Sequence, residues 1–93
     1  MRDISSLRDD LHRTTVEFLR TDVDTGIMLA RIAVGARKDS ERRIRNTRNA
    51  RMAYDTVEKL RRQTPMSTEI RNALDEKIGL LRSLLEVLGE SFA

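Results

Sequence analysis

Arginines are the residues whose type and spacing most readily suggest chemistry in this chain. Residues 37–62 hold ten basic and four acidic side chains, a net charge of +6 in a chain whose total is +3. The planar guanidinium group of arginine makes bidentate contacts with carboxylates and phosphates. This helix face could bind an anion or a nucleic acid, or it could contact another protein. It could also be a solvent-exposed face whose arginines form ion pairs with acidic residues one helical turn away. The candidate anion-binding residues are Arg42, Arg45, Arg48 and Arg51.

A second group of polar residues falls where the apolar stripe of the same segment should continue. Polar side chains on an inward-facing line must be hydrogen-bonded or hydrated. One possibility is that these residues form a small polar pocket, with Asp22 and Asp24 as further partners. The other is that this half of the helix projects beyond the bundle, or that its asparagine side chains cap the ends of neighbouring helices. We expect the tyrosine of this group to face inward, pack against residues 22–36 and hydrogen-bond through its hydroxyl. The pocket candidates are Arg43, Asn46, Asn49 and Tyr54.

The residue types needed for catalysis and metal binding are scarce. The chain has no cysteine and one histidine, His12, with Asp9 one helical turn before it. That turn supplies too few ligands for a metal ion, and the sequence has no glycine-rich phosphate loop and no nucleophile-elbow pattern. We therefore expect no cofactor, no metal and no enzymatic activity.

The elements that must position these residues are helices. The single proline and four glycines in 93 residues favour long helices, and apolar residues recur at three- and four-residue spacing. The sequence predicts one domain over residues 1–93, an all-α antiparallel up-down bundle of three to four helices, at about 4–19, 22–36, 40–63 and 67–89. The first two are predicted to be separate because Thr21 and Asp22 resemble a cap; without proline or glycine at that boundary, one continuous helix is the alternative.

The segment 22–36 is apolar on almost every side. Such a helix is either central in a bundle or part of an interface between copies. Its small residues Gly26, Ala30 and Ala33 would allow a neighbouring helix to approach closely. Together with two apolar residues on the charged face of the next helix, this segment provides the candidate interface residues: Met28, Ile32, Ile44 and Met52.

Two resemblances accompany these patterns. The stretch "NTRNARMAYDTVEKL" resembles the second helix of a tetratricopeptide-type hairpin, with Ala50, Tyr54 and Val57 at the expected spacing. The preceding helix lacks the glycine and aromatic residue of that repeat, so the likeness implies a helical hairpin and not a repeat array. The run "RNTRNARMAYDTV" with the upstream "RTDVDTGIMLA" is similar to small uncharacterised all-helical bacterial proteins, which implies no particular activity.

The combined expectation is a non-catalytic helical protein-interaction module that binds itself or another protein. Nucleic-acid or anion binding through the arginine-rich face is the alternative. No stretch reaches the ~18 apolar residues of a membrane span, so we expect no membrane partner. The charged N-terminal sequence lacks the apolar core of a signal peptide, so we expect a cytoplasmic location.

Overall fold

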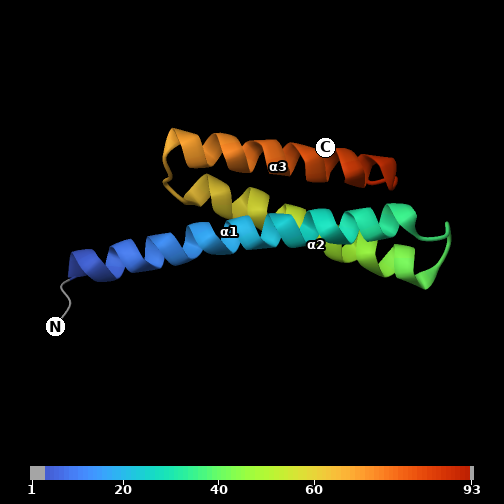
Figure 1. Ribbon diagram of the computed structural model, residues 1–93, viewed down its shortest axis with the longest axis horizontal. Helices are drawn as coiled ribbons and strands as arrows, with labels where there is room; N and C mark the ends of the chain where they lie inside the picture. Colours follow the sequence, from blue (N-terminus) through green and yellow to red (C-terminus); the bar gives the residue numbers. More distant parts are fainter. Residues whose placement is uncertain (1–3, 93) are drawn as a thin grey trace.

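Three α-helices make up the fold. The computed structural model describes residues 4–92, with side-chain surroundings given from Ser6 onward. The helices are α1 (Ile4–Gly35), α2 (Glu41–Gln63) and α3 (Thr68–Val87), and the described residues contain no strand. Figure 1 shows α2 running back along α1, and α3 returning in the opposite direction to α2, where it packs against both α1 and α2. The prediction of an all-helical fold is thus confirmed.

The first two predicted helices, 4–19 and 22–36, form the single helix α1. The prediction of a boundary at Thr21 and Asp22 was wrong because cap-type residues do not end a helix whose buried face continues. Buried Leu19 and Val23 stand on either side of the expected boundary, four residues apart and on the same face. The alternative of one continuous helix is the correct one.

The starts of α2 and α3 agree with the sequence closely. The Ser40 hydroxyl accepts a hydrogen bond from the backbone N–H of Arg43, at 3.1 Å, and the Ser67 hydroxyl accepts one from Ile70, at 3.2 Å. Each serine satisfies a backbone donor that the first helical turn leaves unpaired. Helix α2 ends at Gln63, two residues before Pro65.

Helix α3 ends at Val87, slightly before the predicted residue 89, and its end turns the chain back. Gly89 has a φ of 94°, and Glu90 donates to the carbonyl of Leu85 at 2.9 Å while Gly89 donates to Glu86 at 3.0 Å. This is a Schellman arrangement, in which glycine takes the left-handed position that closes the helix. The following residues consequently return alongside α2 and α3.

Small residues allow α1 to lie close to both other helices. A Cβ atom at Gly26 would lie 2.9 Å from Leu81 Cδ2 of α3 and 3.1 Å from Ala53 Cβ of α2. Ala30 and Ala33 are fully buried on the same side of α1. The predicted close approach is therefore confirmed, and the core is the three-way contact that these residues permit. Its buried members include Leu19, Val23, Ile27, Tyr54, Val57, Leu74, Ile78, Leu81 and Leu85.

Helix α1 is longer than the rest of the bundle. Its 32 residues correspond to about 48 Å, against about 30 Å for the 20 residues of α3. The N-terminal turns of α1 accordingly extend past the connection between α2 and α3 (Figure 1), and the described chain measures 55 × 25 × 19 Å. The first turns of α1 thus lack the neighbours that cover its second half.

Candidate functional site

Three of the four candidate anion-binding arginines have no acidic partner within the described part of the chain. Arg42, Arg45 and Arg48 are exposed on α2 and make no ion pair with any residue that the structure describes. Arg51 differs because it is half-buried and its guanidinium group already has partners within the chain. Its guanidinium contacts Asp55 at 3.1 Å, Glu90 at 3.5 Å and the carbonyl of Ser91 at 2.9 Å.

The four polar-pocket candidates do not line one cavity. Arg43 Nη1 donates to the carbonyls of Ala33 and Ala36, at 3.5 and 3.4 Å, and so binds the C-terminal end of α1. Buried Asn46 donates to the carbonyl of Arg42 in its own helix, at 2.9 Å. These bonds match the alternative in which the polar residues cap helix ends and satisfy backbone groups. Asn49 is exposed on another flank of α2.

Tyr54 lies inward, as predicted, but its main partner was not foreseen. Its ring packs edge-on against Phe92, with 4.8 Å between ring centroids, and Arg51 lies 4.2 Å from the Phe92 centroid. Arg82 of α3 lies 4.8 Å from the same ring. The Tyr54 hydroxyl makes no hydrogen bond to another described residue. The sequence signal that would have indicated this cluster is Gly89, which returns Phe92 to the α2–α3 face.

The two acids at the centre of α1 do not meet the arginines of α2. Asp24 instead pairs with Lys77 of α3, at 2.7 Å. Asp22 lies in a groove beside Phe18, and burial raises the pKa of its carboxyl above the ordinary value of 3.8. A partly desolvated carboxylate next to apolar side chains favours its neutral form.

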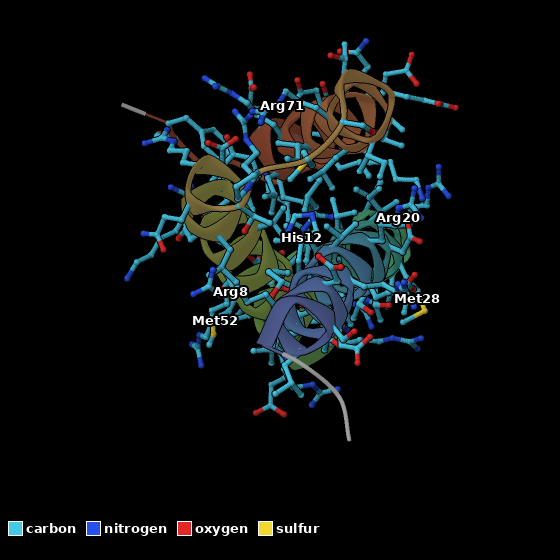
Figure 2. The ribbon with its side chains drawn as sticks, turned by 90° about the vertical axis from the view of Figure 1, so that its left-hand side faces the viewer. Arg8, His12, Arg20, Met28, Met52 and Arg71 are labelled. Carbon is cyan, nitrogen blue, oxygen red and sulfur yellow. The ribbon has the colours of Figure 1, made fainter. Side chains whose placement is uncertain are left out.

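His12 and its surroundings show no arrangement typical of a catalytic or metal site. His12 is exposed and shares a shallow hollow with Asp9, Val16 and Ile70. Figure 2 shows His12 on the side of α1 that faces the bundle. Among the described residues, no three or more histidine, cysteine or acidic side chains gather closely enough to hold a metal ion.

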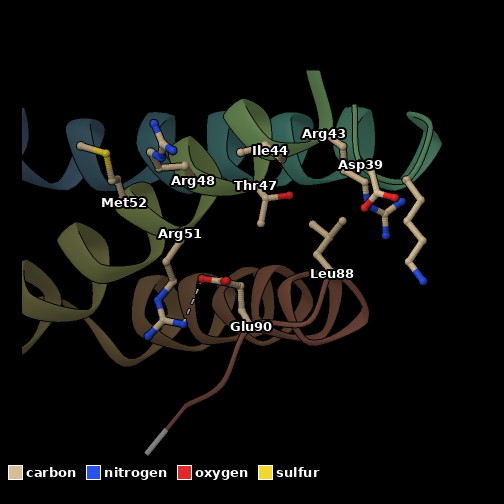
Figure 3. Close-up of a pocket in the computed structure, with 10 residues that line it drawn as sticks. Asp39, Arg43, Ile44, Thr47, Arg48, Arg51, Met52, Leu88 and Glu90 are labelled. Carbon is tan, nitrogen blue, oxygen red and sulfur yellow. Dashed lines mark hydrogen bonds and ion pairs between the residues drawn. The ribbon is translucent and has the colours of Figure 1, made fainter. Parts of the chain in front are cut away.

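A hollow of about 550 Å³ lies between α2 and the end of α3 (Figure 3). Ile44, Thr47 and Leu88 give it an apolar side, while Arg48 stands at its rim. Arg43 and Arg51 also line it but are held by the internal contacts described above. The hollow is open to solvent, and Lys38 and Asp39 of the α1–α2 connection also line it.

The four interface candidates fall on different faces. Met28 and Met52 are 54% and 62% exposed, and Figure 2 shows them on opposite sides of the molecule. Half-buried Ile32 lies in a groove between α1 and α3 together with Met28, whereas Ile44 is exposed on α2. One interface therefore cannot cover all four unless it encircles the bundle.

A further apolar stripe lies on the first half of α1, which begins beyond the connection between α2 and α3. Leu7, Leu11 and Phe18 are 49%, 69% and 48% exposed and share one helical face. The spacing of these residues places them on one helical face, but spacing alone does not show where the neighbouring helices end and so which part of that face is covered.

In comparisons with protein-family models, curated proteins and solved structures, the chain shows no significant match. The tetratricopeptide resemblance therefore gains no support from a family match. No helix among the described residues is long and apolar enough to cross a membrane.

Proposed function

We propose that this protein is a non-catalytic helical interaction module that associates with itself through the exposed face of the first half of α1. The observation that carries the proposal is the exposed stripe of Leu7, Leu11 and Phe18, which begins on the turns of α1 that extend past the other helices and reaches the flank of α2 at Phe18. Contiguous apolar residues left in water are typical of contact surfaces. We further propose the cytoplasm as its location, on the sequence grounds given above.

The spacing of the stripe favours a helix as the partner. Leu7, Leu11 and Phe18 follow one another at four and seven residues, which is the spacing of a helix–helix seam. A helical stretch of fewer than about 12–15 residues is only marginally stable in water without tertiary contacts. Contact with another helix would remove the apolar stripe from water and stabilise these turns together.

Two lysine substitutions test the proposal by sedimentation velocity. Leu11 and Val87 are 69% and 68% exposed, so neither substitution disturbs the core. We expect the wild-type chain and the Val87→Lys control to sediment as dimers at micromolar concentration, and Leu11→Lys to sediment as a monomer with unchanged helical circular dichroism. A monomeric wild-type chain, or equal behaviour of the two variants, contradicts the proposal.

A second candidate function is nucleic-acid or anion binding by Arg42, Arg45 and Arg48. Its support is that all three are exposed and have no acidic partner in the described part of the chain. Three phosphate contacts would give a slope of about −3 for the logarithm of affinity against the logarithm of salt concentration. Heparin and duplex-DNA binding of wild type and of the triple Arg→Gln variant measure this, and absence of retention at low salt rejects it.

A further inference from the structure

A shallow groove continues the exposed stripe of α1 toward the middle of the molecule. Its volume is about 260 Å³, and Phe18, Leu29 and Met52 give it apolar walls. Thr25 contributes from α1, and Asn49 and Thr56 line it from α2. The stripe and the groove share Phe18, so they form one continuous surface on the α1–α2 side.

The stripe and the groove have matching lengths. Leu7 precedes Phe18 by eleven residues, and Leu29 follows it by eleven, which is about 17 Å in each direction along the helix. Eleven residues are close to three helical turns, so all three side chains lie on one face of α1. Leu11 and Thr25 are also placed equally far from Phe18, at seven residues on either side. These positions of α1 are therefore spaced symmetrically about Phe18.

We propose that two copies of this chain pack antiparallel along α1, with a twofold axis at Phe18. Leu7 of each copy then lies over Leu29 of the other, and Leu11 lies over Thr25. This inference rests on the proposed self-association and adds the geometry of the contact. A twofold axis requires one self-complementary patch, and the stripe and groove supply it within one face.

The distribution of charge favours a second copy as the occupant. Residues 4–22 carry three arginines and four acids, a net of −1, whereas residues 41–52 carry five arginines and one acid. Arg43 and Arg51 are held by internal contacts, so Arg42, Arg45 and Arg48 supply the positive charge that has no acidic partner among the described residues. The antiparallel arrangement places the beginning of α1 beside the first half of α2 of the other copy. Arg42 and Arg45, which have no acidic partner in the described residues, continue the row of Asn49 and Met52 on that flank.

Single cysteines test this geometry, because the natural chain has none. A disulfide forms only where two Cα atoms come within about 7 Å. Phe18→Cys should therefore cross-link to itself under mild oxidation. Met28→Cys, which is similarly exposed but lies about 80° around α1 from Phe18 and so outside the proposed contact, should not. Two thiols held together in the dimer have an effective concentration of about 1 mM, whereas thiols that meet only by diffusion are at the ~10 µM concentration of the protein. We therefore expect disulfide formation to be about a hundred-fold faster for Phe18→Cys than for Met28→Cys.

A second experiment mixes two single-cysteine variants, Leu7→Cys and Leu29→Cys, and leaves the Phe18 side chain unchanged. Leu7→Cys and Leu29→Cys should each remain uncross-linked alone, since the two copies of either position stand about 33 Å apart. Mixed, they should yield a covalent dimer. If the wild-type chain is a dimer but the mixture fails to cross-link, or Met28→Cys reacts as fast as Phe18→Cys, this geometry is wrong while self-association stands. If the wild-type chain is a monomer, the proposed function itself fails.

Discussion

At the scale of single residues, Gly26 has the clearest energetic role. Its missing side chain is what allows α1 to contact Leu81 and Ala53 at once. Leu81 is fully buried, so it has no free space into which to move. Gly79 of α3, by contrast, has nothing within 4 Å of the position that a Cβ would occupy.

The two glycines should therefore respond oppositely to alanine. Gly79→Ala should raise the free energy of unfolding by about 0.5–1 kcal/mol through helix propensity. Gly26→Ala gains the same propensity but overpacks the core at a cost of about 1–3 kcal/mol, so we expect net destabilisation. Urea unfolding at one fixed protein concentration measures both, and a stabilising Gly26→Ala would contradict the close approach of the helices.

Tyr54 provides a test of packing against hydrogen bonding. Because its hydroxyl has no hydrogen-bond partner among the described residues, Tyr54→Phe should change the free energy of unfolding by less than the ~0.5–1.5 kcal/mol of a typical hydrogen bond. Tyr54→Ala should cost about 3–5 kcal/mol, as expected for a buried aromatic ring. Thermal unfolding of the two variants separates the contributions, and a large cost for Tyr54→Phe would mean that the hydroxyl is bonded.

Asp22 should make stability fall as pH rises. Its pKa in the folded chain lies above the ordinary value of 3.8 because of burial, so the folded state holds this proton more tightly than the unfolded state does. Stability is therefore lost as pH increases from about 3.8 through the raised pKa, and the loss persists at neutral pH. Asp22→Asn should be more stable than wild type at pH 7 and equal to it below pH 3.8; a difference independent of pH would contradict this.

At the scale of elements, the sequence predicted helix starts better than helix connections. The predicted starts near residues 40 and 67 rest on cap-type residues, with Asp39 or Ser40 and Ser67 or Thr68 as the candidates, because a cap depends on a side chain and a backbone N–H three residues away. Ser40 and Ser67 are the residues that cap. The false boundary at Asp22 arose because local cap chemistry competes with a buried face that continues through it. The burial of Leu19 and Val23 shows that the helix continues through Asp22, but this burial is known only when the neighbouring helices are in place.

The segment after α3 was missed because its contacts are distant in sequence. Phe92 reaches Tyr54 and Arg51 only through the reversal at Gly89. The glycine indicates the reversal, but the local sequence does not show which residues Phe92 then contacts. Arg51 illustrates the consequence: spacing placed it with the free arginines, whereas the returning chain engages it through Ser91 and Glu90.

Removing the Phe92 ring should loosen the contact between α2 and the returning segment. Because the ring is half-buried, we expect Phe92→Ala to cost about 1–2 kcal/mol, less than the 3–5 kcal/mol of a fully buried phenylalanine. Phe92→Leu keeps apolar volume but loses the cation–π contacts with Arg51 and Arg82, worth about 0.5–1 kcal/mol at exposed sites. Chemical denaturation should thus rank wild type, Phe92→Leu and Phe92→Ala in decreasing order; indistinguishable variants would show that this segment contributes nothing.

At the scale of the whole molecule, composition and periodicity were sufficient to predict an all-helical fold. They were not sufficient to predict which apolar residues lie together on the surface. Met28, Ile32, Ile44 and Met52 were grouped from spacing alone, yet Met28 and Met52 face opposite sides. The exposed stripe on α1 follows from the different lengths of α1 and the α2–α3 hairpin, a property of the assembled fold. The proposed interface therefore depends on where helices end more than on which residues are apolar.

Small-angle X-ray scattering of the wild-type chain tests self-association most directly, because forward scattering gives mass and the low-angle slope gives size. A monomer of the described fold has a mass of 10.7 kDa and a Cα radius of gyration of 15.5 Å. We predict twice that mass at micromolar concentration, with a larger radius of gyration, because antiparallel pairing at Phe18 extends the particle beyond one bundle. A mass of 10.7 kDa and a radius near 15.5 Å at every concentration up to ~100 µM, where even a weak specific dimer with a micromolar Kd would be populated, would contradict the account.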